Sequence, residues 1–297
     1  MDIVVCIKQV LDVYGALRYS LRMKQLESKG VPYIISPFDD LALEYALQLR
    51  EHYGGQVTSV CLGKPTARQS LEYCHAAGSD KCLLISEPAS YEVDPYATGK
   101  IMAKAIQSLK YDLILCGLRA VDDNAGVVGA VIAESLALPL VTGTVAIKGL
   151  TGTSPAKLIV HRKAGSGERE VLETILPAVL TVEFGSPLRY PTARSRITAS
   201  KAGVESCDLP DIGLSAETAA QESRLRLVRL SGPKPKLKTL LTPDVSLSPA
   251  DRIGFLTSGG MAKKAGNRLE GEPKVIASKL VQTLADQNLI RLIETNM

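Results

Sequence analysis

The alternation of apolar and polar positions divides the first 140 residues into strands and helices. Short apolar runs predict buried strands, and longer stretches with apolar residues every three or four positions predict amphipathic helices. The predicted strands are residues 2–8, 56–63, 81–85 and 112–117, and the predicted helices are residues 37–53, 65–78, 94–109 and a fourth that ends near Pro139. Residues 17–35 are expected to form an excursion or hairpin. This alternation predicts an α/β fold with a doubly wound, mostly parallel sheet.

The pattern changes after residue 140, where turn residues instead of helices separate the apolar runs. The runs VTGTVAIKG, AKLIVHRK, EREVLETILP and AVLTVEFG predict strands that add an antiparallel part to the sheet. Residues 186–221 are expected to be irregular, RLRLVRLS is a strand candidate and GPKPKLK is a basic linker. A last amphipathic helix is expected at residues 273–288. So sparse a pattern predicts an extended C-terminal arm that wraps a partner.

One rim of the predicted sheet is the expected place for a ligand. In doubly wound sheets, ligands bind beyond the carboxyl ends of the strands, near the reversal in strand order. The predicted strands place residues 6–12, 62–65 and 117–128 on this rim. The longest of these segments lies within CGLRAVDDNAGVVG, residues 116–129, which is therefore the first candidate for a binding loop.

Small residues in this loop favour a phosphate site. Ala125, Gly126 and Gly129 keep side chains away, so backbone N–H groups at the start of the following helix can approach an anion, and Gly126 tolerates a positive φ. The alternative is an ordinary turn in which Asp122, Asp123 or Asn124 caps the helix. Carboxylates repel phosphate and the loop contains no lysine. Local spacing leaves both interpretations open.

Two further stretches have a functional and an ordinary interpretation. SPFDD, residues 36–40, begins a helix with Asp39 or Asp40 as its N-cap. Its free N–H groups either face the rim or belong to a common proline-initiated helix start. A basic series in LRYPTARSRITASK either binds an acidic partner or is a solvated loop. Its members are Arg189, Arg194, Arg196 and Lys201.

Composition excludes several classes of function. The net charge of +4 is small, the basic residues are dispersed, and only three Phe, ten Tyr and no Trp are present, so nucleic-acid binding is not expected. The six cysteines form no C-x-x-C pair, the N-terminus has no secretory signal and no apolar stretch has the length of a membrane span. We therefore expect a cytoplasmic protein without a membrane span.

No familiar catalytic motif is present. The chain lacks G-x-G-x-x-G, Walker A, H-E-x-x-H and G-x-S-x-G patterns and contains only three histidines. We therefore assign no catalytic residue and no metal ligand. A protein whose chemistry belongs to a cofactor remains compatible with this pattern.

Five ordered stretches resemble one family. VVCIKQVLD, SPFDDLALEYALQL, CHAAGSDKCLLI, GLRAVDDNAGVVGAVIAESLALP and LPAVLTVEFGSPLRYPT are similar, at matching separations, to motifs of the β subunit of electron transfer flavoproteins, including the related FixA-type proteins. The resemblance covers most of residues 1–190. It implies an adenine-nucleotide-binding, flavodoxin-like fold in residues 1–190, followed by a partner-docking loop and a C-terminal arm in residues 191–297.

The resemblance also implies cofactors and a site. It implies a heterodimer with an α subunit, with FAD near the subunit interface, and either AMP or a second FAD bound within this chain. Matching the motifs position by position gives the cofactor-binding residues Cys6, Ser36, Pro37, Phe38, Asp39, Leu62, Gly117, Leu118, Arg119, Ala120, Val121, Asp122, Asp123, Asn124, Ala125, Gly126, Val127 and Val128. These positions lie on the rim that the strand pattern predicts.

Departures from the family motifs leave the identity of the bound nucleotide open. Arg119 replaces a glutamine, and residues 126–128 replace polar residues, so a phosphate would depend on backbone N–H groups and on Arg119. Val128 resembles the electron-bifurcating members, whereas Asp123 resembles the AMP-binding ones. ARSRITASK lacks the apolar anchor of the docking loop, which implies a partner that is unusual or is bound through basic residues. Residues 240–270 have no recognisable counterpart.

The function that the resemblance implies is that of an electron carrier rather than an enzyme. The chain would be the β subunit of an electron transfer flavoprotein that shuttles electrons between a dehydrogenase of the acyl-CoA type and a further redox partner. The alternative is an adenine-nucleotide-binding regulatory module of the same fold without flavin. A hydrolase that uses Asp122 or Asp123 as a base is a third hypothesis, and it requires a metal or a nucleophile.

Overall fold

The computed structural model divides the chain into two compact units, Met1–Pro233 and Lys234–Met297. It describes residues 1–12, 14, 18–20, 25–27, 30–86, 94–152, 156–225, 228, 243, 246–257 and 271–286, with the backbone alone at residues 18–20 and 25–27.

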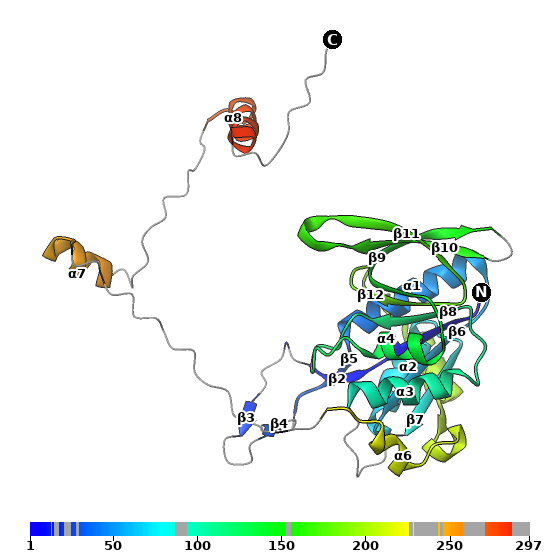
Figure 1. Cartoon of the computed structure of the whole chain (residues 1–297). Coiled ribbons are helices and arrows are strands. Elements are labelled where there is room, and N and C mark those ends of the chain that lie inside the picture. Colours follow the sequence, from blue (N-terminus) through cyan, green and yellow to red (C-terminus); the bar gives the residue numbers. More distant parts are fainter. Residues whose placement is uncertain are drawn as a thin grey trace. The chain divides into compact units, whose positions relative to one another are not determined.

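A nine-stranded sheet forms the centre of the first unit, in the order β11-β10-β9-β12-β8-β1-β6-β7-β13 (Figure 1). Its strands are β1 (Ile3–Ile7), β6 (Val57–Gly63), β7 (Lys81–Ser86), β8 (Leu113–Gly117), β9 (Leu140–Thr151), β10 (Lys157–Lys163), β11 (Arg169–Ile175), β12 (Ala178–Val182) and β13 (Glu205–Cys207). The strands from β9 to β13 in this order are parallel, and β10 and β11 add an antiparallel edge. The predicted α/β class with a mostly parallel sheet is confirmed.

One predicted antiparallel strand has the other direction. β12, within the run AVLTVEFG, lies between β8 and β9 and is parallel to both. All five of its residues are buried, as in a central strand that is covered on both faces. The apolar run of β12 was the local signal for a central strand. Its parallel direction was not predicted because no helix precedes the strand.

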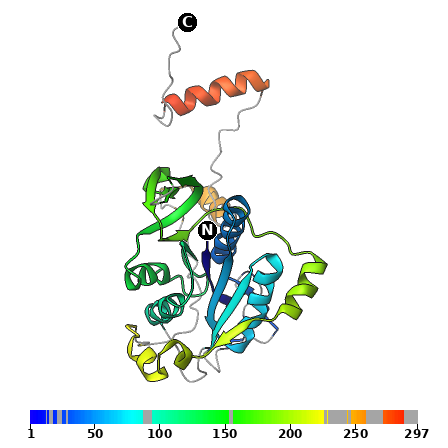
Figure 2. The same cartoon turned by 90° about the vertical axis from the view of Figure 1, so that its right-hand side faces the viewer.

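Helices cover both faces of the sheet: α1 (Pro37–Tyr53), α2 (Arg68–Ala77), α3 (Pro95–Ile106) and α4 (Val128–Ser135). Figure 2 shows α1 and α2 on one side and α3 and α4 on the other. Alternate residues of β1 supply the two cores: Val5 packs with α1 and α2, and Val4 packs with α3 and α4. The apolar run of β1 is continuous because both of its faces are buried.

The start of α1 differs from the prediction. Its N-cap is Ser36, which makes no side-chain capping bond, and Pro37 occupies the first turn. Asp39 and Asp40 lie inside the first turn, so the prediction that one of them is the N-cap was wrong. The helix ends at Gly54, as the glycine pair predicted.

The excursion between β1 and α1 consists of two antiparallel strand pairs. β2 (Gln9–Leu11) pairs with β5 (Tyr33–Ile35), and β3 (Arg18–Ser20) pairs with β4 (Gln25–Glu27). This arrangement agrees with the predicted excursion or hairpin at residues 17–35, and it leaves the carboxyl end of β1 beside the start of α1.

The segment predicted to be irregular is folded. Residues 186–221 contain α5 (Ala193–Ala202), the edge strand β13, a 3₁₀ turn (Leu209–Ile212) and α6 (Ala216–Gln221). Thr192 caps α5 and Ser215 caps α6 through their hydroxyl groups, and α5 packs against α2. The compact unit thus continues past residue 190. That residues 191–297 act as a separate docking segment stays a prediction.

The second unit contains two described helices, α7 (Pro249–Thr257) and α8 (Pro273–Asp286). α8 was predicted, whereas α7 lies in a segment for which no element was expected. Apolar side chains on both helices are exposed, including Ile253 and Leu280. The strand candidate RLRLVRLS and the linker GPKPKLK fall largely outside the described residues.

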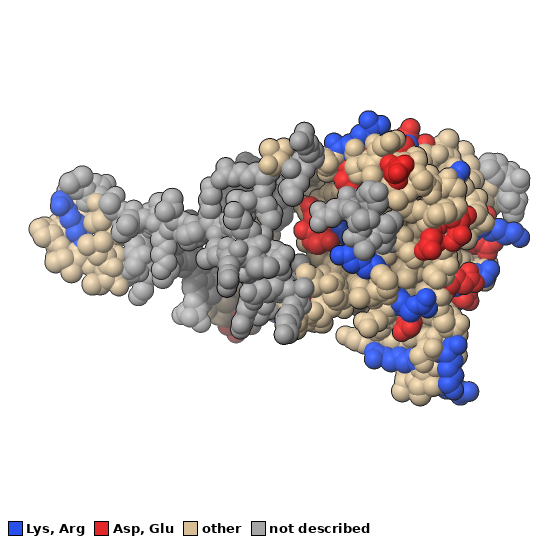
Figure 3. Space-filling model, turned by 90° about the horizontal axis from the view of Figure 1, so that it is seen from below, with Lys and Arg blue, Asp and Glu red and all other residues tan. Residues whose placement is uncertain are grey.

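Surface charge is mixed, as the composition predicted. On the described part of the face seen in Figure 3, basic and acidic side chains are interspersed instead of gathering into a basic patch. None of the helices in the described ranges is long and apolar enough to cross a membrane.

Candidate functional site

A cavity of about 180 Å³ lies at the carboxyl ends of β1, β6 and β8. From β1 the chain continues to β6 and β7 on one side, and later returns to β8 on the other side of β1. The cavity is therefore located at the reversal in strand order, where doubly wound sheets bind ligands. The sequence predicted this rim from the order of strands and helices.

The structure brings together most of the predicted site residues. Those that line the cavity are Cys6, Asp39, Leu62, Gly117, Leu118, Arg119, Ala120, Asp123, Ala125, Gly126 and Val128. Those that do not line it are Ser36, Pro37, Phe38, Val121, Asp122, Asn124 and Val127. The members of this second group lie within one to three residues of a lining residue in the sequence.

Other lining residues were not among the predicted ones: Ile7, Lys8, Pro95, Thr98, Met102 and Cys116. Lys8 belongs to the rim segment 6–12 and to the family stretch VVCIKQVLD, but it was not among the predicted cofactor-binding residues. Pro95, Thr98 and Met102 come from α3, which follows β7. A helix that follows a parallel strand begins near the carboxyl edge of the sheet. The strand order therefore indicated that residues at the start of α3 lie at the rim, although the family motifs do not include them.

Asp39 ties three segments of the rim together. One carboxylate oxygen accepts the backbone N–H of Lys8 at 2.8 Å, and the other accepts the backbone N–H of Gly117 at 3.0 Å. The side chain is buried, and burial raises the pKa of Asp39 to about 7 although both N–H donors favour the charged form. Asp39 thus holds α1 against the ends of β1 and β8.

Gly117 is needed at the end of β8 because of this contact. A Cβ atom there would lie 2.3 Å from Oδ1 of Asp39 and 2.8 Å from the Cβ of Phe38. Either contact forces the rim apart. The glycine at the head of the loop therefore permits the close approach of α1 to β8.

Lys8 forms ion pairs with both carboxylates of the loop and compensates one of their two negative charges. Its Nζ lies 2.9 Å from Oδ1 of Asp122 and 2.8 Å from Oδ2 of Asp123. Burial raises the pKa of Asp123, but the hydrogen bonds from Lys8 and from the N–H of Ala125 outweigh it and hold that pKa below the usual value. The objection that two carboxylates repel a phosphate is thereby reduced.

The carboxylates do not cap α4. The N-cap of α4 is Val127, which has no side-chain bond, so the alternative of an Asp122, Asp123 or Asn124 cap was wrong. Instead they shape the loop: Asp122 accepts the N–H of Asp123, and Asp123 accepts the N–H of Ala125. Gly126 has a φ of 65°, which confirms its predicted positive φ.

The loop geometry changes the set of available N–H donors. The N–H of Asn124 is bonded to the carbonyl of Ala120, and that of Ala125 to Asp123. These two N–H groups are therefore already used within the loop. The remaining donors are the N–H groups of the first turn of α4, which begins at Val128 and has no intrahelical acceptors for them.

Besides Lys8, Arg119 is the other cation in the lining of the cavity. Its guanidinium is exposed and lies 5.3 Å from the centre of the Phe38 ring. The inner wall is apolar and includes Ile7, Leu62 and Met102. The cavity therefore combines an apolar interior with cations and helix N–H groups at its mouth.

Two buried cysteines, Cys6 and Cys116, also line the cavity. A hydrogen bond with Cys116 and burial both raise the pKa of Cys6 well above its usual value, so Cys6 remains a thiol at neutral pH. Among the described residues, no group of three or more His, Cys, Asp or Glu side chains is arranged to hold a metal ion. The third hypothesis, a hydrolase, thus has no partner for Asp122 or Asp123 in this part of the chain.

Comparison with known proteins identifies the family. The family model described as "Electron transfer flavoprotein domain" matches residues 24–211, more than half of the chain. The β subunit of the electron transfer flavoprotein of Thermoanaerobacterium thermosaccharolyticum is 34% identical, over 91% of this chain and 97% of the relative. The chain belongs to the electron transfer flavoprotein β-subunit family.

Other relatives agree with this assignment. The β subunit of the electron transfer flavoprotein of Bacillus subtilis is 29% identical over 97% of this chain and 98% of its own length. A protein named caffeyl-CoA reductase-Etf complex subunit CarD, from Acetobacterium woodii, is 36% identical over 73% of this chain and 82% of its own length. Family members are electron-transfer subunits of flavoproteins, so the electron-carrier role is shown at the level of the family.

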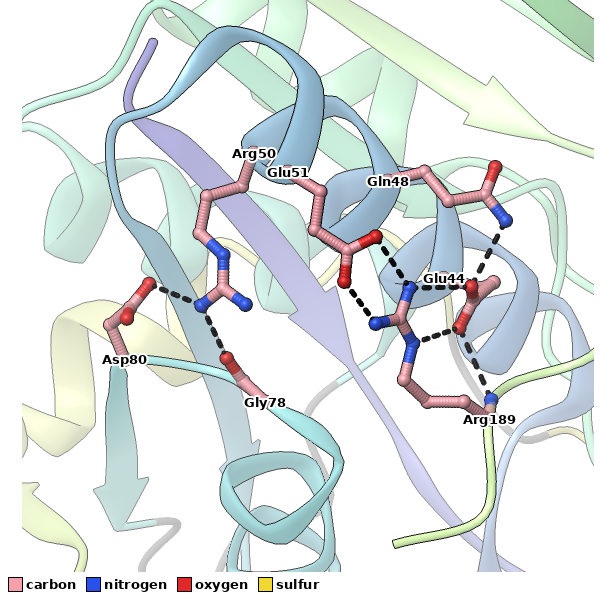
Figure 4. Close-up of polar contacts among 7 residues, drawn as sticks. All are labelled: Glu44, Gln48, Arg50, Glu51, Gly78, Asp80 and Arg189. Carbon is pink, nitrogen blue, oxygen red and sulfur yellow. Dashed lines mark hydrogen bonds and ion pairs between the residues drawn. The ribbon is translucent and has the colours of Figure 1, made fainter.

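One residue predicted to dock a partner is used inside the chain. Figure 4 shows Arg189 between Glu44 and Glu51 of α1. Its guanidinium binds both Glu44 oxygens, at 2.9 and 3.0 Å, and also binds Glu51. Burial raises the pKa of Glu44, but Arg189 outweighs it and lowers that pKa. Arg189 is thus a structural ion-pair partner, and the expectation that it binds an acidic partner is corrected.

The rest of the basic series lies on α5. Arg194, Arg196 and Lys201 are all exposed, and the guanidinium of Arg196 lies over the ring of Tyr73, 5.6 Å from the ring centre. Apolar side chains are exposed here as well: 88% of Tyr190 and 59% of Ile197. The segment is a capped helix with apolar contacts to offer, and therefore differs from the anchor-free basic loop expected from the sequence.

Proposed function

We propose that this chain is the β subunit of a heterodimeric electron transfer flavoprotein, and that the rim cavity binds an adenine nucleotide. The observation that carries the proposal is the position of the cavity. It lies at the strand-order reversal and is lined by most of the residues that match the family motifs. Family membership supports the electron-transfer part of the proposal.

The residues of the cavity fit an adenine nucleotide. An apolar wall with Ile7, Leu62 and Met102 suits an adenine ring, and the first-turn N–H groups of α4 suit a phosphate. Gly126 brings the backbone close: a Cβ there would lie 3.3 Å from the carbonyl of Leu118. The proposed ligand is AMP or, in an electron-bifurcating complex, the AMP half of a second FAD.

The redox chemistry belongs to a flavin shared with an α subunit. We propose that this chain supplies binding and orientation, and that the complex exchanges electrons with an acyl-CoA-type dehydrogenase. The name of the Acetobacterium woodii relative, which includes a caffeyl-CoA reductase, supports this type of donor or acceptor. We place the complex in the cytoplasm, as expected from the sequence.

We propose that the dehydrogenase docks at α5. Tyr190 and Ile197 offer exposed apolar contacts, and Arg194 and Lys201 offer positive charge. Arg189 takes no part, since Glu44 and Glu51 engage it. Apolar contacts surrounded by cations fit an acidic surface with an apolar recess.

Identification of the bound nucleotide tests this function. The chain is co-expressed with its α subunit, and the cofactors that heat or acid releases are separated and quantified. One FAD and one AMP per dimer indicate a simple carrier, and two FAD indicate a bifurcating complex. A flavin-containing dimer without a nucleotide in this chain contradicts the site. A colourless homo-oligomer that binds ATP favours the regulatory module and overturns the flavoprotein role.

A pair of glycine variants checks where the nucleotide binds. Gly126→Val inserts a side chain at the mouth of the cavity, at a φ of 65°, and is expected to reduce the retained nucleotide at least several-fold. Gly167→Val is the matched control, with a φ of 84° in a turn where a Cβ has no atom within 4 Å. Equal retention in both variants would contradict the assignment of the cavity.

A further inference from the structure

Lys8 is fixed at the strand-order reversal by its own backbone. It follows β1 directly, and its N–H donates to Asp39, whose other oxygen holds Gly117 at the end of β8. Lys8 is among the residues that line the cavity. Its position is therefore set by two strands and a helix, not by the loop that it contacts.

The ammonium group of Lys8 has a third N–H donor that the two loop carboxylates do not use. A lysine ammonium has three N–H donors. Two of them bind Asp122 and Asp123, and within the described part of the chain no third acceptor is recorded. Burial lowers the pKa of Lys8, but the hydrogen bonds from the two aspartates outweigh it and raise that pKa. Lys8 is thus charged at neutral pH and has one N–H for a ligand in the cavity.

The charges explain why a ligand needs this donor. Without Lys8, the loop would present two carboxylates to a phosphate dianion at the mouth of the cavity. Arg119 is the other cation in the lining, and it lies over the Phe38 ring at the exposed edge. Lys8 is the cation that contacts both carboxylates and lines the cavity.

We propose that Lys8 is the phosphate-recognition residue of this cavity: two of its N–H donors bind Asp122 and Asp123, and the third binds a phosphate oxygen of the nucleotide. The inference rests on the proposed nucleotide function and extends it to specificity. Lys8 makes the cavity prefer phosphorylated adenine nucleosides over adenosine.

Calorimetric titration of the nucleotide-depleted complex with AMP and with adenosine tests the proposal. Lys8→Gln is expected to weaken AMP binding about 10- to 100-fold, the range for a lost hydrogen bond to a charged group. Adenosine binding is expected to change by less than about threefold, because adenosine has no phosphate. Lys8→Arg, which keeps the charge, is expected to restore most of the preference for AMP.

Lys163→Gln is the matched control. It removes the same charge and an exposed ion pair, with Glu183, at a residue that does not line the cavity. It should leave both affinities unchanged. Equal losses of AMP and adenosine affinity in Lys8→Gln would mean that Lys8 only shapes the loop, and unchanged AMP affinity would mean that Lys8 does not touch the phosphate. Either result overturns the proposal.

Asp123→Asn provides an independent test, because it removes the negative charge of this side chain and keeps its shape. The amide oxygen can still accept the N–H of Ala125, while the negative charge is lost. AMP is expected to bind about 2- to 5-fold tighter, because Lys8 then has more charge to offer the phosphate. Weaker AMP binding contradicts the charge mechanism. A wild-type complex that binds neither AMP nor adenosine instead refutes the nucleotide function itself.

Discussion

Two Asp-Asp pairs lie at the same rim and have opposite electrostatics. Asp39 and Asp40 lie in the first turn of α1, where burial raises the pKa of each to about 7. Asp122 and Asp123 lie in the exposed loop, where Lys8 lowers the pKa of Asp123. At the start of α1, the Asp-Asp pair is thus buried and its ionisation is unfavourable. In the loop, the anionic form of Asp123 is stabilised. Burial and the nearest cation decide the difference.

The burial of Asp39 gives it a structural task that Asp122 lacks. Truncating Asp39 leaves the N–H groups of Lys8 and Gly117 without their acceptor at the junction of two strands and a helix. Truncating Asp122 leaves Lys8 with a second carboxylate at 2.8 Å, in contact with solvent. The two pairs should therefore respond very differently to the same substitution.

The largest expected effect is that of Asp39→Ala on stability. At about pH 5, below the raised pKa of Asp39, the wild-type carboxyl is largely neutral, so lost hydrogen bonds dominate. We expect a loss of about 2–4 kcal/mol in the free energy of unfolding, measured by urea denaturation. Asp122→Ala is expected to cost less than about 1 kcal/mol. Similar losses in both variants would remove the distinction between the pairs.

Glu44 offers an intermediate case, a carboxylate that is buried and also paired. Arg189→Met removes its partner and should cost about 1–3 kcal/mol. The pKa of Glu44, followed by NMR titration of its carboxyl carbon, should rise. Lys157→Met breaks an exposed ion pair with Glu173 and should cost less than about 0.5 kcal/mol. An unchanged Glu44 pKa would show that Arg189 does not stabilise the anion.

The last expected effect, that of Asp40→Asn, depends on pH. One carboxylate oxygen of Asp40 is buried and has no hydrogen-bond partner among the described residues, and burial raises the pKa of Asp40 to about 7. The pKa of Asp40 is higher in the folded than in the unfolded state. The contribution of Asp40 to the free energy of unfolding is therefore most favourable at low pH, and it is lost as the pH rises toward 7. Asp40→Asn should therefore raise Tm at about pH 8 and have little effect at about pH 4. A Tm gain independent of pH would exclude ionisation as the cause.

Local sequence patterns were sufficient to predict the order of helices and strands and the rim of the sheet at which the cavity lies. The continuous apolar run of β1, the proline start and glycine end of α1, and the loop after β8 are signals within single segments. Because strands of a doubly wound sheet run parallel, their order alone places the loop at the cavity. The failures came where packing decided the outcome: β12 needed its place between β8 and β9, and α5 was hidden in a segment without a strong apolar period.

The roles of individual site residues depended on partners far along the chain. Asp39 accepts from Gly117, 78 residues away, Lys8 binds Asp122, 114 residues away, and Arg189 binds Glu44, 145 residues away. No spacing rule connects such positions. A sequence shows that a carboxylate is present, but its burial and its cation are properties of the packed chain.

The sequence by itself determined the α/β alternation, the rim on which a ligand would bind and the family, because these follow from local periodicity and from motifs. Tertiary structure alone decided that Asp39 is a buried clamp, that Asp122 and Asp123 share an ion pair with Lys8, and that Arg189 pairs with Glu44 and Glu51. The physical reason is that hydrogen bonds and ion pairs depend on distance in space, and on how far each charge is removed from water.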